Sequence, residues 1–378
     1  MAKTVTKTQR EPFFHVVKRD DMPWWKAWTI RAATIVIAFL LVGVLSMTVT
    51  ERNFGETYGI MLQGVFGRLF EGRTTMLWKY LQEIAILLSL ALALTPAFKM
   101  KFWNCGAEGQ ALVGGLASII CMIELGPKLP YPVLITVIAL TSILAGAIWG
   151  IIPAIFKALF NTNETLFTLM MNYVAIQLTS YFVSIWENPK GSNSVGLINM
   201  GTKGGWFPEV FGQQYMLNVI IVLAVTIAMF VYLKWSKPGY EIAVVGESVN
   251  TAKYAGIKVS KVIIRTMAIS GAVCGIAGFV TVAGSSHTIS TNVAGGRGFT
   301  AIIVAWLAKF NTFVMILISF LLIFLDQGAS EIASKYDLND YTSKMLTGII
   351  LFFILGSEFF INYKLNFRHK EKAGKEDK

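Results

Sequence analysis

Long runs of apolar residues, separated by shorter polar segments, extend along most of the chain. A membrane-spanning helix needs about 20 mostly apolar residues, and about ten runs approach that length. In lipid a helix satisfies its own backbone hydrogen-bonding groups. We therefore expect an all-α polytopic membrane protein with about ten transmembrane helices. The expected spans are 27–49, 80–98, 104–125, 132–156, 165–186, 216–234, 262–284, 294–308, 311–327 and 343–363.

The polar segments divide the chain into an N-terminal segment (1–26), a transmembrane domain (27–363) and a basic tail (364–378). Within the transmembrane domain, one polar loop (235–262) is flanked by basic residues. The run 57–70 is apolar but supplies only about half of a crossing. We expect it to be interfacial or re-entrant.

The distribution of charge predicts the orientation. Only 15% of residues are charged, against about 25% in soluble domains, yet the net charge is +11. Basic residues concentrate in the two terminal segments and in the loop 235–262, whereas 187–215 and 328–342 lack this excess. The positive-inside rule then places both termini and that loop in the cytoplasm. We expect a bacterial plasma (inner) membrane protein. No aromatic–basic interleaving indicates nucleic-acid binding.

Two expected spans begin with glycine-rich polar runs, NCGAEGQ at 104–110 and AGGRGF at 294–299. Each follows the first span of a four-span set, and we expect the two to run in opposite directions. Short, glycine-broken spans at matching positions of two halves indicate a transporter's substrate site and an inverted repeat with broken helices. Alternatively, the glycines only permit close helix packing.

Polar side chains inside these spans are candidates for a substrate pathway. Asn104, Glu108 and Gln110 lie at the first broken start, where an ionisable group is costly and by default functional. Glu108 could equally be a helix-start residue, because a helix N-terminus favours negative charge. Asn172 lies about two turns inside its span and needs a partner on another helix or on a solute. Arg297 either contacts solute at the outer mouth or extends to the surface.

The loop segment GYEIAVVGESVNTAKYAGI (239–257) reads as structured. We expect a bend before it, a turn at Gly246 and a short helix from an N-cap at Ser248 to a stop at Gly256. Ala252 and Ala255 keep one flank of that helix small, so another protein could approach closely. The alternative is an ordinary solvated connector.

Motifs for chemistry are missing from the sequence. It contains no GxxxxGK[ST], HExxH or GxSxG pattern, and its three cysteines all lie in apolar segments without metal-ligand spacing. We therefore expect no enzyme, no catalytic residue, no metal and no cofactor in this chain. Any ATP must be hydrolysed by another chain.

Four segments together resemble a known family: AFKMKFWNCGAEGQ (97–110), NETLFTLMMNY (163–173), the loop segment 239–257, and GFTAIIVAWLAKFN (298–311). The chain resembles permease subunits of bacterial ABC importers that serve ribose, branched-chain amino acids and nucleosides. It is most similar to nucleoside permeases that work with basic-membrane-lipoprotein receptors. It departs from their pattern at Cys105, where a β-branched aliphatic is usual, and at Lys309 and Phe310, where a glycine precedes a small or basic residue.

The resemblance implies two permease subunits, here expected to be different polypeptides, two cytoplasmic ATP-binding subunits that hold ATP–Mg, and an external solute-binding lipoprotein. The loop would be the coupling helix that docks on the ATPase. A nucleoside is the expected solute, with a ribose-like sugar or riboflavin as alternatives. The residues expected to carry the coupling are Gly246, Glu247, Ala252, Tyr254, Ala255 and Gly256.

Two other functions remain open at this point. An ion-coupled secondary carrier would use Glu108 as its titrating group, and would transport solute without an ATPase. A non-transporting scaffold in a membrane complex would show no solute-dependent change when Asn104, Glu108 and Asn172 are replaced.

Overall fold

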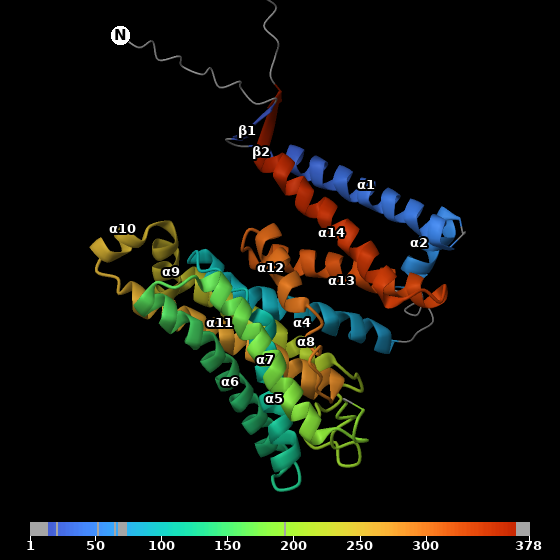
Figure 1. The fold of residues 1–378 in the computed structure, drawn as a ribbon, viewed down its shortest axis with the longest axis vertical. Helices are drawn as coiled ribbons and strands as arrows, with labels where there is room; N and C mark the ends of the chain where they lie inside the picture. Colours follow the sequence, from blue (N-terminus) through green and yellow to red (C-terminus); the bar gives the residue numbers. More distant parts are fainter. Residues whose placement is uncertain are drawn as a thin grey trace, which may run out of the picture. The chain divides into compact units, whose positions relative to one another are not determined.

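A computed structural model of the protein describes residues 14–19, 22–50, 53–63, 66, 74–192 and 194–367. These residues are helical apart from loops and one two-stranded ribbon (Figure 1). The elements are β1 (Phe14–Lys18), α1 (Trp24–Thr50), α2 (Phe54–Leu62), α4 (Thr74–Lys99), α5 (Ala107–Leu125), α6 (Tyr131–Phe160), α7 (Glu164–Trp186), α8 (Met216–Trp235), α9 (Lys237–Glu247), α10 (Val249–Tyr254), α11 (Val259–Thr281), the π-turn η2 (Val282–Ser286), α12 (Arg297–Leu307), α13 (Thr312–Lys335), α14 (Asp340–Asn362) and β2 (Tyr363–Phe367).

Nine of the described helices are long and apolar enough to cross a membrane. The predicted helical, polytopic fold is therefore confirmed. The expected span 294–308 forms only α12, whose 11 residues extend about 16 Å, roughly half of the hydrocarbon layer. Within 57–70, the structure describes the end of α2, Gln63 and Phe66, and the rest lies outside the described residues. The inverted repeat remains a prediction.

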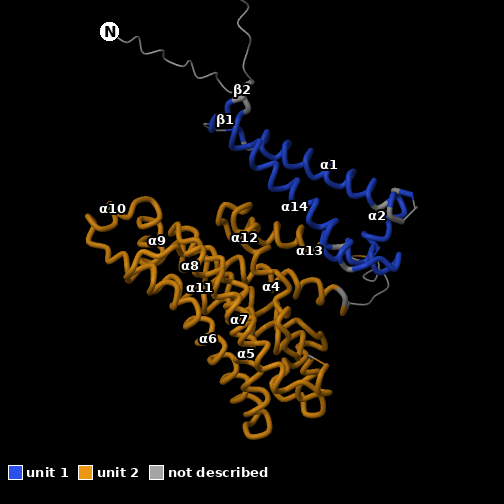
Figure 2. Tube along the Cα trace, in the orientation of Figure 1, with its two compact units in different colours: residues 1–64, 325–378 blue, residues 65–324 orange. Residues whose placement is uncertain are grey.

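The chain forms two compact units, 1–64 with 325–378 and 65–324 (Figure 2). In the first unit α1 packs along α14, and β1 pairs antiparallel with β2 from Phe14 opposite Phe367 to Lys18 opposite Tyr363. This pairing brings the two terminal segments together, as expected if both occupy one compartment. Which compartment that is stays a prediction, and the remaining parts of 1–26 and 364–378 lie largely outside the described residues.

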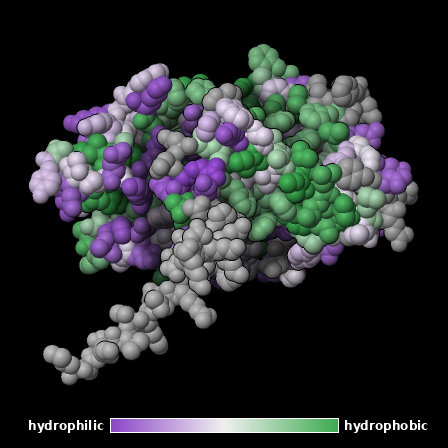
Figure 3. All heavy atoms as spheres, turned by 90° about the horizontal axis from the view of Figure 1, so that it is seen from above, coloured by the Kyte–Doolittle hydropathy of each residue, from purple (hydrophilic) through white to green (hydrophobic). Residues whose placement is uncertain are grey.

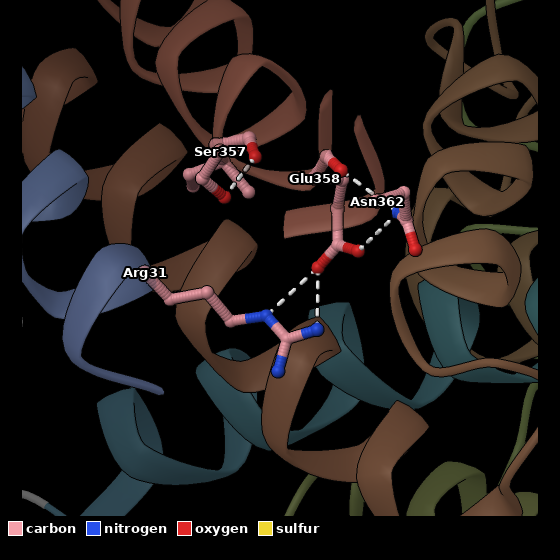
Figure 4. Close-up of polar contacts among 5 residues, drawn as sticks. Arg31, Ser357, Glu358 and Asn362 are labelled. Atoms are coloured by element: carbon pink, nitrogen blue, oxygen red, sulfur yellow. Dashed lines mark hydrogen bonds and ion pairs between the residues drawn. The ribbon is translucent and has the colours of Figure 1, made fainter. Parts of the chain in front are cut away.

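An ion pair links the two long helices of this unit (Figure 4). The Arg31 guanidinium donates to Oε1 of Glu358 from Nε at 2.7 Å and from Nη2 at 2.5 Å. The Asn362 side-chain amide donates to the backbone oxygen of Glu358 at 2.8 Å. Both ionisable side chains are mostly buried, with 22% and 19% of their areas exposed. Charges on apolar helices need such partners, so the pair fixes α1 against α14.

In the second unit α11 lies at the centre, packed against α4, α5 and α6. Glycines allow the close approach: a Cβ on Gly114 of α5 would lie 2.6 Å from Cα of Gly275 on α11, and one on Gly150 of α6 would lie 2.6 Å from the Met267 oxygen. Small residues at helix crossings are typical of membrane proteins. By contrast, only 22%, 28% and 22% of the spanning windows of α6, α7 and α8 are buried, as expected for contact with lipid. Hydrophobic residues also form broad areas on the face of the molecule drawn in Figure 3.

The segment between α7 and α8 folds back over the end of α11. The Phe207 amide donates to the Ala283 oxygen at 2.9 Å, and the Ile198 amide donates to the His287 oxygen at 3.0 Å. The Trp206 and His287 rings stack with centroids 3.8 Å apart. These contacts fix the start of the chain that leads into α12.

Candidate functional site

The broken start of α5 is fastened to α7 by side chains that accept and donate backbone hydrogen bonds. The Asn172 amide nitrogen donates to the Cys105 oxygen at 2.9 Å, and its amide oxygen accepts from Gly109 N at 2.9 Å. One turn earlier on α7, the Thr168 hydroxyl accepts from Cys105 N at 3.1 Å. Asn172 is buried, so its amide satisfies backbone groups that the interrupted helix leaves free.

A second amide network joins the same segment to α11. The Asn104 amide nitrogen donates to Ser270 Oγ at 3.0 Å, and the Gln110 amide nitrogen donates to Asn104 Oδ1 at 3.2 Å. All three side chains are buried. The structure thus brings the predicted Asn104, Gln110 and Asn172 into one polar cluster among apolar helices.

Glu108 bridges the two broken helices. Its Oε1 accepts from Gly296 N at 2.8 Å and its Oε2 accepts from Gly298 N at 2.7 Å. The carboxylate therefore lies at the N-terminus of α12 while standing in the first turn of α5. Helix N-termini present free amides and partial positive charge, so one carboxylate stabilises both. Glu108 therefore acts as a helix-start residue for both α5 and α12.

Arg297, the first residue of α12, forms an ion pair with Glu83 of α4. Both side chains are more than two-thirds buried, so the arginine head is held within the protein. Glu83 is not among the candidate residues predicted from the sequence. A carboxylate in an otherwise apolar span is costly without a partner, and this signal could have identified it.

These contacts form one structure, which we call the junction: Asn104, Glu108, Gln110, Asn172 and Arg297 with their partners Glu83 and Ser270. The N-termini of α5 and α12 meet there. In the junction, backbone amides donate to the Glu108 carboxylate, and the Arg297 guanidinium pairs with the Glu83 carboxylate. What remains is a set of amide and hydroxyl groups that can exchange hydrogen bonds with a neutral polar molecule.

The loop after α8 forms α9 and α10 and is anchored on its inner face. Ile242, Val245 and Ala252 pack in one apolar cluster with residues from the ends of α4 and α11. Glu241 on α9 accepts from Arg265 Nη2 on α11 at 2.9 Å. These contacts join α9 to α4 and α11, which both reach the junction.

Gly246 does not form the predicted turn. It lies inside α9, where a Cβ would overlap the Lys99 carbonyl oxygen. Glycine is needed there for close approach of α9 to α4, rather than for chain reversal. The chain leaves the helix two residues later, at Ser248 between α9 and α10.

The short helix α10 has the predicted ends. Ser248 Oγ accepts from Thr251 N at 3.2 Å, and Gly256 follows the helix with a φ of +76°. Ala252 is fully buried, so it supports α10 from within and does not offer a flank to a partner. The exposed members of the predicted coupling set are Glu247, Tyr254, Ala255 and Gly256, with Tyr254 93% exposed.

Residues 76–355 match the family model described as "Branched-chain amino acid transport system / permease component". The guanosine ABC transporter permease protein NupP of Bacillus subtilis is 28% identical over 327 residues, which cover 85% of this chain and 91% of NupP. The glucose ABC transporter permease protein TsgB13 of Haloferax volcanii is 26% identical over 358 residues, 92% of each chain. The nucleoside ABC transporter permease protein NupB of Lactococcus lactis is 26% identical over 293 residues, 75% of this chain and 80% of NupB.

No solved structure matches the chain. The family model covers most of the sequence, including the junction and the loop with α9 and α10. The chain is thus a multi-pass transporter component and not an enzyme. It belongs to the family of branched-chain amino acid transport system permease components and is a permease subunit of an ABC importer.

Proposed function

We propose that this permease forms the translocation pathway for a small neutral polar solute, with a nucleoside as the first choice, and that the solute passes the junction. The observation that carries the proposal is the buried amide cluster of Asn104, Gln110 and Asn172 where α5 and α12 begin. Its amides already hold one another and the backbone. A solute with hydroxyl and ring-nitrogen groups could replace these bonds without leaving a charge unpaired.

Two observations support a nucleoside over a sugar. The names of NupP and NupB include the words guanosine and nucleoside, although the name of TsgB13 includes glucose. Trp103, which precedes Asn104 in the chain, stacks on Trp306 near the C-terminal end of α12 with ring centroids 5.2 Å apart, and flat aromatic faces suit a purine ring. Ribose-like sugars and riboflavin remain the alternatives to be tested.

The proposed energy source is ATP–Mg on separate cytoplasmic subunits that dock on α9 and α10. ATP binding would draw two such loops together and shift the spans between inward- and outward-facing states, provided that nucleotide favours one state. The second permease is proposed to be a different polypeptide, because two distinct guanosine permease proteins of Bacillus subtilis, NupP and NupQ, resemble this chain. An external lipoprotein would deliver the solute, and both termini would lie in the cytoplasm of a bacterial cell.

Uptake into proteoliposomes tests this function. We expect radiolabelled guanosine to accumulate only when the second permease, the ATPase, the receptor and ATP are all present. Excess unlabelled nucleoside should compete, and excess ribose, glucose or riboflavin should not. If only ribose, glucose or riboflavin competes, that compound replaces the nucleoside as the proposed substrate, and the proposal of an ABC importer is unaffected.

The ion-coupled alternative is tested by the purified chain alone under a proton or sodium gradient. If the purified chain accumulates solute under such a gradient, and the Glu108→Gln variant does not, the protein is a secondary carrier and the proposed function is wrong. The contacts of Glu108 favour the importer, because backbone amides of α12 hold both of its oxygens.

A further inference from the structure

A cavity of about 560 Å³ lies where the ends of α4 and α8 meet the loop between α12 and α13. Three lysines line it: Lys99, Lys234 and Lys309. None of them forms an ion pair with another described residue. Three positive charges around one cavity create a local potential that attracts an anion.

The backbone beside the cavity adds to this attraction. The 24-residue helix α13 begins there with no acidic residue in its first turn. Asn311 Oδ1 accepts from Phe313 N at 3.0 Å and from Val314 N at 3.4 Å, so the helix adds the partial positive charge of its dipole and not free amides at these two positions. Lys309 and Phe310 both have left-handed backbones, with φ of +47° and +60°, and their amides donate to the Trp306 and Ala305 oxygens at 3.0 and 3.1 Å. Strained non-glycine residues cluster at functional sites.

The wall of the cavity is suited to a lipid. Phe230 and Phe313 line the cavity, and their rings pack edge-on with centroids 5.3 Å apart. Trp235, beside the lining, packs edge-on against Phe230 with centroids 5.5 Å apart. Phe313 and Trp235 are 65% and 68% exposed. Exposed aromatic rings beside lysines at the ends of spanning helices mark the headgroup layer. About one turn away from Phe230 and Phe313 on the same helices, Ile227 of α8 and Leu317 of α13 are also exposed, so acyl chains can lie along these two helices.

We propose that this cavity binds the headgroup of an anionic phospholipid, such as phosphatidylglycerol, on the side of the membrane where α9 and α10 lie. The phosphate contacts the ammonium groups of Lys99, Lys234 and Lys309, and the acyl chains cover Phe313 and Trp235. Basic pockets between transmembrane helices bind such headgroups. A free phosphate ion would use the lysines and leave the aromatic rings uncovered.

The test is native mass spectrometry of the delipidated full-length permease, titrated with dioleoyl phosphatidylglycerol or dioleoyl phosphatidylcholine. We expect the first phosphatidylglycerol to bind at least about tenfold more tightly than phosphatidylcholine. The double variant Lys234→Gln with Lys309→Gln should weaken phosphatidylglycerol binding by about thirtyfold, since each lysine near anionic lipid contributes about a fivefold factor. Lys234→Arg with Lys309→Arg should retain tight binding.

The matched control is Lys128→Gln with Lys190→Gln, which removes the same charge from exposed lysines outside the cavity and should leave lipid binding unchanged. Equal affinity for the two lipids, or an equal loss in the control, would overturn the proposal. So would full displacement of the lipid by inorganic phosphate at about the same concentration. If the assembled importer no longer binds phosphatidylglycerol at this cavity, the cavity is a contact site for a protein partner and the proposal is wrong.

Discussion

Gly298→Ala tests the contact between the two broken helices. A Cβ at this position would lie 2.5 Å from Glu108 N, 2.7 Å from its Oε2 and 2.8 Å from its Cα. Two of these atoms are backbone and cannot rotate away, so α12 would have to move by about 1 Å to restore ordinary packing. Such overpacking costs about 1–3 kcal/mol. The shift would also lengthen the two hydrogen bonds to Glu108, which are charge-assisted and contribute about 1.5–3 kcal/mol each.

Thermal unfolding of the purified permease in detergent and ATP-driven uptake in the reconstituted importer are the two assays. We expect a lower midpoint and a loss of uptake for Gly298→Ala. Glu108→Gln should lower the midpoint as well, and the double variant should lose less than the two single variants together, because both act on one contact. Gly348→Ala is the control: no atom lies within 4 Å of the added Cβ, and alanine favours a helix by about 1 kcal/mol. If Gly298→Ala behaves like this control, α5 and α12 do not meet as described.

Three further predictions concern other parts of the chain. Arg31→Met should lower the free energy of unfolding by about 1.5–3 kcal/mol, because it leaves Glu358 without its charged partner. The double variant Arg31→Met with Glu358→Leu should recover part of that loss. An unchanged free energy of unfolding for Arg31→Met in a denaturation assay would contradict the ion pair. Burial lowers the pKa of His287, more than a backbone hydrogen bond with Val282 raises it. Its contribution to stability should therefore be complete above about pH 6.5 and be lost as the pH falls below that value; His287→Gln should flatten this dependence of the unfolding midpoint. In a cysteine-free background, Lys253→Cys should react with an impermeant maleimide in inside-out vesicles and not in intact cells, and the reverse pattern would invert the topology.

The sequence predicts the helical membrane fold well because hydropathy and length alone decide whether a segment can span lipid. Nine of the ten predicted spans correspond to spanning helices. The glycine-rich run before Arg297 also indicates that the expected span 294–308 is broken, and its helical part is the 11-residue α12. The ends of α10 follow from local rules, since Ser248 and Gly256 act on their own neighbours in the chain.

The junction could be predicted only as a set of polar residues. The partners of Glu108 lie 188 and 190 positions away, and those of Asn172 lie 63 and 67 away, so no local pattern contains them. The sequence around Gly246 predicts a turn, because the Lys99 carbonyl that crowds this glycine comes from another helix. The sequence places Ala252 on the partner surface, because a small residue suits both a protein contact and a tight core.

ATP-driven uptake by the variant Tyr254→Ala with Ala255→Glu tests most directly whether a separate motor protein drives this permease through α10. Both side chains are exposed, so the fold should persist, and the unfolding midpoint and membrane insertion should match those of the unaltered protein. In proteoliposomes that contain the complete importer, we expect this variant to lose solute uptake, while Tyr341→Ala, which removes another exposed tyrosine, keeps it. Normal uptake by the α10 variant would contradict the account.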